Sequence, residues 1–468
     1  MRLSIALLAG LLFSTIAQAT AAPAGMPQAD PLDQQAAMLR DRALMENETW
    51  RMVEDLTTEI GPRPAGSTAE ARARQWAVAR LKALGFTNVH VEPFEIPRWE
   101  RGEERLMVLG NSAQPMAITA LGNSGATPAQ GIDAQVIGFD GLDALKAAPD
   151  GSLKGKIAFI THRMARTQDG SSYGAFGPVR WVGPSIAAEK GAIATIIRSV
   201  GTDHHRVPHA GSTSWKAGQT PTPAGALSVP DAEQMERLLA RGLVRVHLLL
   251  APRRGGTAMS GNVIADIPGR SRAGEIVLAG GHLDSWDLGT GAIDDAAGIA
   301  VTAAAAKLIL ASGMHPERTI RIVFWGSEEI GDLGAAAYAS AHAGDRHVLA
   351  GESDFGAGKI WALGSHVAAD ALPEVARMAR LLAPLGVAPA DNDSRAGSDV
   401  GPLAQAGVAT ISPRQDGRHY FDIHHTADDT LDKIDPAALN QNVATWATIL
   451  WIAANSPAHF SPTPPAAR

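Results

Sequence analysis

Histidine and acidic residues recur directly after short apolar runs of this sequence. His282 follows the run 275–279, and the pair Glu328-Glu329 follows the run 319–325. The other residues of this kind are Asp284, Asp294, Asp295, Glu352, Asp354, His424 and His425. Imidazole and carboxylate groups are common ligands of zinc. Because the chain has no cysteine, thiolate sites and thiol nucleophiles are excluded. The pattern therefore predicts a metal site built from nitrogen and oxygen ligands.

Each motif taken singly also has a structural explanation. The adjacent carboxylates Glu328 and Glu329 are typical of a helix start, where acidic side chains favour the positive end of the helix dipole. A lone histidine such as His282 is often only a hydrogen-bonding residue. However, several strand ends would bring unpaired acids into one glycine-lined cleft, and this repulsion is costly unless cations neutralise it. The whole set therefore favours a metal site.

The segments that carry these residues alternate between strand-like and helix-like patterns after Gly261. The expected strands are 275–279 and 319–325, and the expected helices are 296–310, 333–341 and 436–454. Such alternation predicts an α/β fold with a mostly parallel central sheet flanked by helices. Ligands bind beyond the carboxyl ends of the strands in such sheets, so the motifs should meet at that edge.

The chain is long enough for more than one domain. Its 468 residues exceed the roughly 250–300 at which a single core stops growing. Between Gly110 and Gly256 the pattern changes to short β segments separated by Gly and Pro. We therefore expect a β-rich domain over 110–256, inserted into a discontinuous catalytic domain of residues 20–109 and 257–460. Residues 461–468 are expected to be a flexible tail.

The N-terminus has the pattern of an export signal. Arg2 precedes an apolar run over 3–17, and the small-residue pattern Ala17-Gln18-Ala19 follows. We interpret residues 1–19 as a signal peptide and expect a periplasmic or secreted protein. The formal net charge of −7 and the absence of a basic run argue against nucleic acid and anionic membranes as partners. No later stretch reaches the ~20 apolar residues of a membrane span.

Taken together and in this order, the motifs resemble those of peptidase family M28, the co-catalytic zinc exopeptidases. Residues 282–287 with 291–295 are particularly similar to the secreted carboxypeptidase Q branch, also called plasma glutamate carboxypeptidase. The resemblance extends from the segment 61–67 to the last predicted helix. It also implies that the insert is a protease-associated domain and that the protein is a homodimer.

The resemblance implies a site with two zinc ions per chain. Asp294 would bridge the two ions. His282 and Asp354 would bind one of them, and Glu329 and His425 would bind the other. Neighbouring residues point in different directions, so Glu328 and Glu329 should have different tasks, and the resemblance makes Glu328 the general base.

Several other roles follow from the same resemblance. Asp284 would orient His282 and fix its tautomer. His424 is the rival of His425, which is preferred because it directly precedes Thr426. Tyr420 is a candidate to hydrogen-bond the developing oxyanion, although a packed tyrosine with its hydroxyl on the backbone fits equally well.

Two groups have competing interpretations. Ser398-Asp399 either lines the cleft, as in the family, or Asp399 caps the following helix. His204, His205 and His209 are close in sequence, but Pro208 prevents a continuous helical histidine face. We expect these three histidines to be solvated in a loop and to bind no metal.

The function implied is a secreted or periplasmic zinc exopeptidase that hydrolyses dipeptides or short peptides. The motifs leave open which terminus is recognised, and we prefer a free amino terminus. A zinc-activated water would attack the peptide carbonyl with Glu328 as base, and the insert would narrow access. The alternatives are another zinc amidohydrolase, such as a deacylase or a glutaminyl-cyclase-like enzyme, and a non-catalytic receptor-like module of the same fold. Loss of ligands would mark such a module, but all the ligand positions are filled here.

Overall fold

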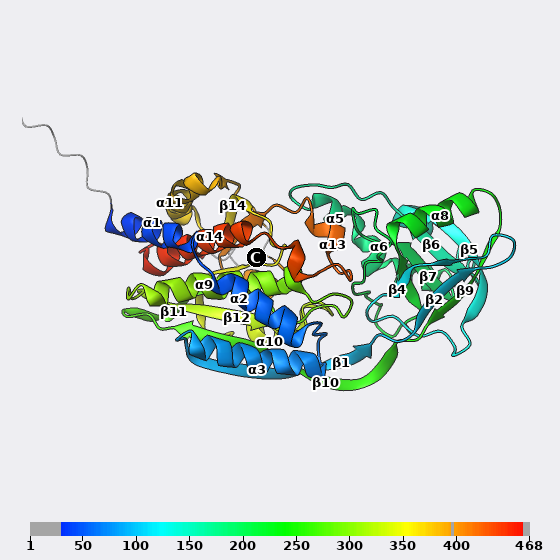
Figure 1. The fold of residues 1–468 in the computed structure, drawn as a ribbon, viewed down its shortest axis with the longest axis horizontal. Helices are drawn as coiled ribbons and strands as arrows, with labels where there is room; N and C mark the ends of the chain where they lie inside the picture. Colours follow the sequence, from blue (N-terminus) through cyan, green and yellow to red (C-terminus); the bar gives the residue numbers. More distant parts are fainter. Residues whose placement is uncertain (1–29, 395–396, 462–468) are drawn as a thin grey trace, which may run out of the picture.

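The computed structural model describes residues 30–394 and 397–461, which form two lobes joined by a long β ribbon (Figure 1). Each lobe is built on an eight-stranded sheet, ordered β1-β10-β12-β11-β13-β16-β14-β15 in the catalytic lobe. The strands of this sheet are β1 (Thr87–Glu100), β10 (Arg253–Ile267), β11 (Arg272–His282), β12 (Arg318–Trp325), β13 (Arg346–Glu352), β14 (Ile360–His366), β15 (Ala388–Pro389) and β16 (Thr410–Gln415). The predicted signal peptide and residues 462–468 of the predicted tail lie outside the described residues.

The centre of the catalytic sheet is parallel. β12, β11, β13 and β16 are neighbours that run in the same direction, whereas β10 and β14 join this core by antiparallel pairing. The predicted α/β class is therefore confirmed. The antiparallel pairs toward both edges were not predicted, because the alternation of elements identifies strands but not the direction of those at the edges.

Different helices cover the two faces of this sheet. On β11, Val277 and Ala279 belong to the apolar cluster that contains α9 (Ala297–Ala311) and α14 (Pro436–Asn455). The alternate residues Ile276 and Leu278 belong to a second cluster with α10 (Leu333–Ala341) and α12 (Gly401–Gln405). This division follows from the two-residue period of a strand. No helix within the described ranges is long and apolar enough to cross a membrane.

The other helices of this lobe lie at its surface or beside the site. They are α1 (Pro31–Ala43), α2 (Glu48–Asp55), α3 (Thr68–Ala83), α11 (Leu372–Leu382) and α13 (Tyr420–Ile423). Single turns of π or 3-10 helix span Leu56–Ile60, Ala292–Ala296, Ala369–Ala371, Ala383–Leu385 and Leu431–Lys433. α3 begins with a side-chain cap, since the Ser67 hydroxyl accepts from the amide of Glu70, and the Glu70 carboxylate accepts from the amide of Gly66, one residue before the cap.

The second lobe holds the other sheet, ordered β3-β2-β9-β5-β6-β7-β8-β4. Its strands are β2 (Glu104–Val108), β3 (Gln114–Met116), β4 (Ile118–Ala120), β5 (Ile132–Asp140), β6 (Ile157–Thr161), β7 (Ala194–Arg198), β8 (Ala224–Leu227) and β9 (Val244–Leu250). Its helices are α4 (Gly141–Ala147), α5 (Ser171–Phe176), α6 (Pro178–Trp181), α7 (Gly183–Glu189) and α8 (Val229–Leu239). β2 lies ahead of the expected boundary at Gly110. The lobe also contains helices, which the Gly- and Pro-punctuated pattern of a β-rich domain did not indicate.

The ribbon of β1 and β10 carries the chain into and out of the second lobe (Figure 1). The two strands pair antiparallel from Thr87 opposite Asp266 to Glu100 opposite Arg253. Both strands run past the edge of the catalytic sheet. The inserted lobe is thereby held beside the carboxyl ends of the parallel strands.

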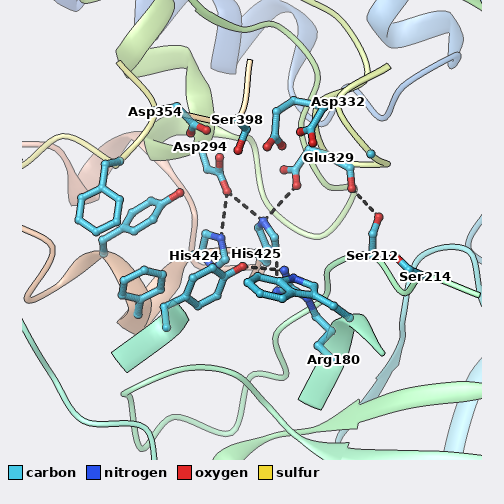
Figure 2. Close-up of a pocket in the computed structure, with 17 residues that line it drawn as sticks. Arg180, Ser212, Ser214, Asp294, Glu329, Asp332, Asp354, Ser398, His424 and His425 are labelled. Carbon is cyan, nitrogen blue, oxygen red and sulfur yellow. Dashed lines mark hydrogen bonds and ion pairs between the residues drawn. The ribbon is translucent and has the colours of Figure 1, made fainter. Parts of the chain in front are cut away.

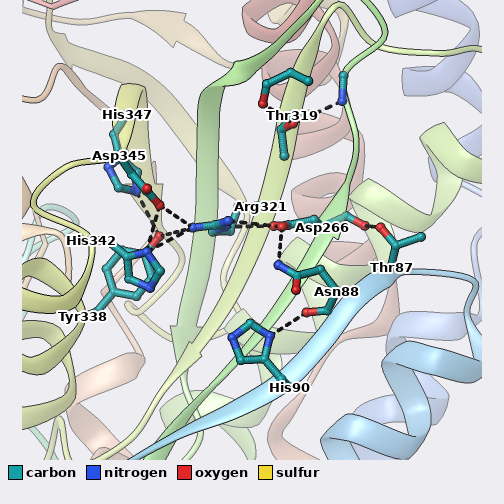
Figure 3. A network of polar contacts seen from close by, with 12 residues as sticks. Thr87, Asn88, His90, Asp266, Thr319, Arg321, Tyr338, His342, Asp345 and His347 are labelled. Atoms are coloured by element: carbon teal, nitrogen blue, oxygen red, sulfur yellow. Dashed lines mark hydrogen bonds and ion pairs between the residues drawn. The ribbon is translucent and has the colours of Figure 1, made fainter.

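A buried ionic network connects β10, β12 and α10 (Figure 3). The Arg321 guanidinium on β12 donates to both carboxylate oxygens of Asp266 on β10, at 2.8 and 3.1 Å, and to Asp345 at 3.0 Å. The Tyr338 hydroxyl on α10 lies 3.3 Å from the same guanidinium. Because each buried charge has a partner, the network links β10, β12 and α10 without leaving an isolated ion.

Close approach of α9 to the strand ends requires glycine at position 298. A methyl group there would overlap the carbonyl oxygen of Ser353 and the carboxylate of Asp295. We expect Gly298→Ala to cost about 1–3 kcal/mol of stability through overpacking, although alanine is the better helix former. Gly274→Ala, which adds a methyl group in open space, is the matched control. Unfolding midpoints of both variants test this, and an unchanged midpoint for Gly298→Ala would contradict the packing described.

Candidate active site

The parallel strands bring the predicted motifs to one edge of the sheet. His282 ends β11 and is in register with Trp325, the last residue of β12, so Glu328 and Glu329 follow just beyond it. β13 pairs on the other side of β11 and leads to Asp354. The segments are far apart in the sequence, but their strand ends coincide in space. This is the arrangement that the sequence pattern predicted.

Asp294 lies at the centre of the site, in the loop that leads into α9. Its Oδ1 is 3.0 Å from Nε2 of His282, which is 3.5 Å from Asp354 Oδ1. Its Oδ2 is 3.2 Å from Nε2 of His425, which is 3.0 Å from Glu329 Oε2 (Figure 2). Asp294 therefore presents one oxygen to each of two histidine–carboxylate pairs, and all five predicted metal ligands lie together.

The side chains present fit a pair of metal ions. Asp294 Oδ2, Glu329 Oε1 and Asp354 Oδ1 are buried and have no hydrogen-bond partner among the described residues. Buried carboxylate oxygens without donors are costly unless a cation lies beside them. Nε2 of His282 faces the carboxylates of Asp294 and Asp354, and Nε2 of His425 faces those of Asp294 and Glu329. Imidazole nitrogen with carboxylate oxygen is a donor set that zinc prefers.

The pKa values of the histidines and of Asp294 reflect the excess of negative charge in this site. Burial alone would lower the pKa of His425, but Glu329 and Asp294 raise it to about 9. Burial alone would raise the pKa of Asp294, but the neighbouring imidazoles of His282 and His425 hold it well below its usual value. The site therefore favours positive charge strongly, whether that charge is a proton or a metal ion.

His424 and His425 stack on each other with ring centroids 3.5 Å apart. Nε2 of His424 approaches only Asp294, at 3.7 Å, whereas Nε2 of His425 approaches both Asp294 and Glu329. Both histidines belong to a group with Asp294 that could hold a metal ion. The closer contacts with two carboxylates favour His425, as the sequence interpretation expected.

Asp284 contacts His282 through its main chain. Nδ1 of His282 lies 2.9 Å from the backbone carbonyl oxygen of Asp284, but 3.8 Å from its carboxylate. The main chain, rather than the side chain, therefore holds the Nδ1 proton and leaves Nε2 free for a metal. The carboxylate instead accepts from the amide of Glu328 at 3.2 Å, and burial raises its pKa to about 7.

Glu328 and Tyr420 line a cavity of about 420 Å³ that is also lined by Asp294, Glu329 and His425. Burial raises the pKa of Glu328, and Asp354 and Glu329 add to this effect while His282 opposes it. The Tyr420 ring packs on Phe355 and Phe421, but its hydroxyl makes no hydrogen bond to any described residue. The alternative of a hydroxyl bonded to the backbone is therefore not what the structure shows.

The two interpretations of Ser398-Asp399 are also separated. Ser398 lines the cavity, while both carboxylate oxygens of Asp399 are buried without a hydrogen-bond partner in the described chain. No side chain caps α12. Burial and the nearby carboxylate of Glu352 raise the pKa of Asp399. The interpretation of Asp399 as a helix cap is therefore wrong. Its carboxylate instead lies near those of Glu352 and Asp354.

The prediction for the three loop histidines is right for two and wrong for one. His204 and His205 are exposed, but His209 is buried. Nε2 of His209 lies 2.7 Å from Asp203 Oδ1, and Nδ1 lies 2.7 Å from the carbonyl oxygen of His424. Its burial depends on a loop of the other lobe, which sequence proximity could not reveal. None of the three is in a group that could hold a metal among the described residues.

The inserted lobe also supports the ligand loops through main-chain contacts. The amide of Ala210 donates to the carbonyl oxygen of His425 at 2.9 Å. The Ser212 hydroxyl donates to the carbonyl oxygen of Glu329 at 2.5 Å. These contacts hold the backbone of two of the expected ligands from outside the catalytic sheet.

Arg63 is a positioning residue that the sequence interpretation missed. It is fully buried and donates to the carbonyl oxygens of Leu283 at 2.5 Å, Thr290 at 2.7 Å and Gly291 at 2.9 Å. These carbonyls belong to the loop between His282 and Asp294. The motif Gly61-Pro62-Arg63-Pro64 was a visible signal, but its target is more than two hundred positions away.

Comparison with known proteins agrees with this geometry. The sequence matches the family model of Peptidase family M28 over residues 262–450. Carboxypeptidase Q of Bos taurus is 34% identical over 417 residues, which cover 88% of this chain and 86% of that protein. The crystal structure of a peptidase M28 precursor from Shewanella amazonensis SB2B is 47% identical, with a TM-score of 0.91 over 93% of this chain and 99% of that chain. A zinc aminopeptidase from Bacillus subtilis, 20% identical with a TM-score of 0.63 over 88% of this chain and 96% of that one, shares the fold.

The fold and these relatives define the class of the protein as a metallopeptidase. The chain belongs to peptidase family M28. The family assignment made from the motifs is thereby confirmed.

Replacement of Arg63 should show how much the site loop depends on it. Arg63→Lys keeps a positive charge but cannot reach three carbonyls, so we expect a loss of about 3 kcal/mol in the free energy of unfolding. Arg98→Lys, at an exposed arginine paired with Glu100, is the control. Denaturant unfolding curves measure both, and equal stability of the two variants would contradict the role of Arg63.

Proposed function

We propose that this chain is a co-catalytic zinc exopeptidase that binds two zinc ions and hydrolyses dipeptides or short peptides. The observation that carries the proposal is Asp294, whose two carboxylate oxygens face separate histidine–carboxylate pairs. His282 and Asp354 would hold one ion, and Glu329 and His425 the other, with Asp294 between them. This is the arrangement of ligands that two-metal hydrolysis requires.

Zinc, when bound, supplies Lewis-acid chemistry that lowers the pKa of a water and polarises the peptide carbonyl. Glu328 accepts a proton from the attacking water and returns it to the leaving amine. Burial raises the pKa of Glu328, and a carboxylate with a raised pKa is a stronger base for this role. The free hydroxyl of Tyr420 donates a hydrogen bond to the developing oxyanion.

The cavity supports small substrates. Its volume of about 420 Å³ is in the range of small-ligand sites, and Tyr173, Arg180 and Trp181 of the inserted lobe close one side. Such a site admits a short peptide more readily than a folded chain. The carboxylate of Asp332, which lines the same cavity, favours a free ammonium group, and this supports recognition of the amino terminus.

Two alternatives are less well supported. A deacylase or a glutaminyl-cyclase-like enzyme would use the same metal chemistry, and only the choice of substrate separates it from a peptidase. A non-catalytic receptor-like module would not need a complete set of ligands and an acid-base residue.

Export through the predicted signal peptide and a homodimeric state are also part of the proposal. N-terminal sequencing of the periplasmic protein tests export, and analytical ultracentrifugation tests the homodimer.

Zinc binding should release protons at neutral pH. The pKa of His425 near 9 means that this imidazole is protonated at pH 7 and must lose its proton to coordinate. Zinc affinity should therefore rise with pH between about 7 and 9, by up to roughly tenfold per unit for each displaced proton. Calorimetry in buffers of different ionisation enthalpy measures the released protons. Binding that is independent of pH, or full activity after verified metal removal, would contradict the site.

The two adjacent glutamates should separate catalysis from metal binding. Glu328→Gln keeps size and hydrogen bonding but cannot accept the proton, so kcat should fall by roughly 10²–10⁴ with zinc content retained. Glu329→Gln replaces a charged ligand with a neutral one, so zinc affinity and activity should fall together. Metal analysis and kcat are measured for both variants. Zinc loss in Glu328→Gln alone would reverse the two roles.

A further inference from the structure

The loop that carries His425 is a tight turn in which this histidine has a left-handed backbone. The amide of Thr426 donates to the carbonyl oxygen of Ile423 at 3.0 Å and closes the four-residue turn. His424 has φ −49° and ψ 127°, and His425 has φ 61°. These angles are those of a type II turn, whose third residue is in the region that favours glycine or asparagine. A histidine at this position must therefore be held there by its surroundings.

The peptide group between His424 and His425 decides which turn forms. In a type I turn this group points the opposite way, and the third residue has a negative φ that histidine adopts without strain. The two turns differ mainly by the flip of this one peptide group. Whatever binds its carbonyl oxygen therefore selects the backbone conformation of His425, and with it the direction of the side chain.

Two consecutive residues of the inserted lobe hold the peptide groups on both sides of His425. Nδ1 of His209 donates to the carbonyl oxygen of His424 at 2.7 Å. The amide of Ala210 donates to the carbonyl oxygen of His425 at 2.9 Å. Together these bonds restrain both backbone rotations of His425. The bond from His209 is the one that prevents the flip of the peptide group.

His209 is itself fixed within the inserted lobe. Its ring is completely buried, and Nε2 lies 2.7 Å from Asp203 Oδ1. The other oxygen of Asp203 accepts from the amide of His205 at 2.8 Å, so this carboxylate is also held in place. A methyl group at Gly201 would overlap the imidazole, so glycine leaves the room that the ring needs. An imidazole bound at both nitrogens keeps one orientation.

The other half of the metal site has no such support from the inserted lobe. His282 is held by the carbonyl oxygen of Asp284 and by the carboxylate of Asp295, both in the catalytic lobe. Within residues 30–394 and 397–461, no residue of the inserted lobe makes a hydrogen bond to His282 or Asp354. Loss of the bond from His209 should therefore disturb one ion position and not the other.

We infer that His209 is a positioning residue of the active site. Its bond to the carbonyl oxygen of His424 keeps the turn in the type II form, and this form aims Nε2 of His425 at the position of the second ion. The inserted lobe thereby controls one of the two metal positions. The role of His425 as a ligand rests on the proposed function, whereas the control of the turn does not.

The test removes this bond and measures the affinity for each zinc ion. His209→Leu replaces the donor with an apolar side chain, and His209→Asn restores a donor near the position of Nδ1. In stepwise zinc titrations of the full chain against a competing chelator, His209→Leu should weaken one ion by about 10–100-fold and leave the other unchanged. His209→Asn should recover most of this loss. Asp203→Ala, which keeps the donor but frees the ring, should give a smaller loss on the same ion.

The matched control is His162→Leu. His162 is a buried histidine of the same lobe, and it bonds the carbonyl oxygen of Arg198 inside that lobe. Both leucine variants lose a buried hydrogen bond, but His162→Leu should keep both zinc affinities. Equal weakening of both ions in His209→Leu, or the same weakening in His162→Leu, would assign His209 to the general stability of the lobe and overturn the inference. Unchanged affinities in both His209→Leu and Asp203→Ala would also overturn it.

Two further measurements assign the affected ion and separate the inference from the proposed function. In the His425→Ala background, the addition of His209→Leu should not weaken the remaining ion, and a further loss would contradict the positioning role. A crystal structure of metal-free His209→Leu should show a flipped peptide group and a negative φ at His425. A left-handed His425 in that structure would overturn the inference. If the wild type binds no second zinc ion, the proposed function fails, while this structure still decides whether His209 controls the turn.

Discussion

The concentration of buried negative charge around Asp294 is the constraint on which the rest of the structure depends. Burial raises the pKa of Glu328, Glu329 and Asp399, which lie close to one another at the strand ends. Carboxylates held this close repel one another unless cations are present. The histidines, the buried Arg63 and the proposed metal ions supply that positive charge. Without this positive charge, repulsion between the buried carboxylates would destabilise the fold.

The architecture can be understood as the support of this charged centre. Parallel strands end at one edge, so ligands from distant segments meet there. Glycines at 281 and 298 let α9 approach the strand ends, where any side chain would collide with Asp295. Arg63 fixes the loop between His282 and Asp294 through main-chain carbonyls. The inserted lobe completes the support by holding the backbone of His425 and Glu329.

The sequence predicted the parallel core from its alternating strand and helix patterns, and the five expected ligands from the resemblance of their motifs to peptidase family M28. It did not predict residues whose partners lie far along the chain, such as Arg63 and His209. It predicted that Asp284 orients His282, but sequence alone does not say whether the carboxylate or the main-chain carbonyl of that residue makes the contact. The start of the inserted lobe at β2 was hidden for a similar reason, since its partner β9 is distant in sequence.

The most direct test of the central claim is anomalous diffraction at the zinc edge from crystals of the zinc-loaded protein. The account predicts two anomalous peaks on either side of the Asp294 carboxylate, roughly 3.5–4 Å apart, one beside His282 and Asp354 and the other beside His425 and Glu329. A single peak, a peak held by His424 in place of His425, or peaks away from Asp294 would contradict it.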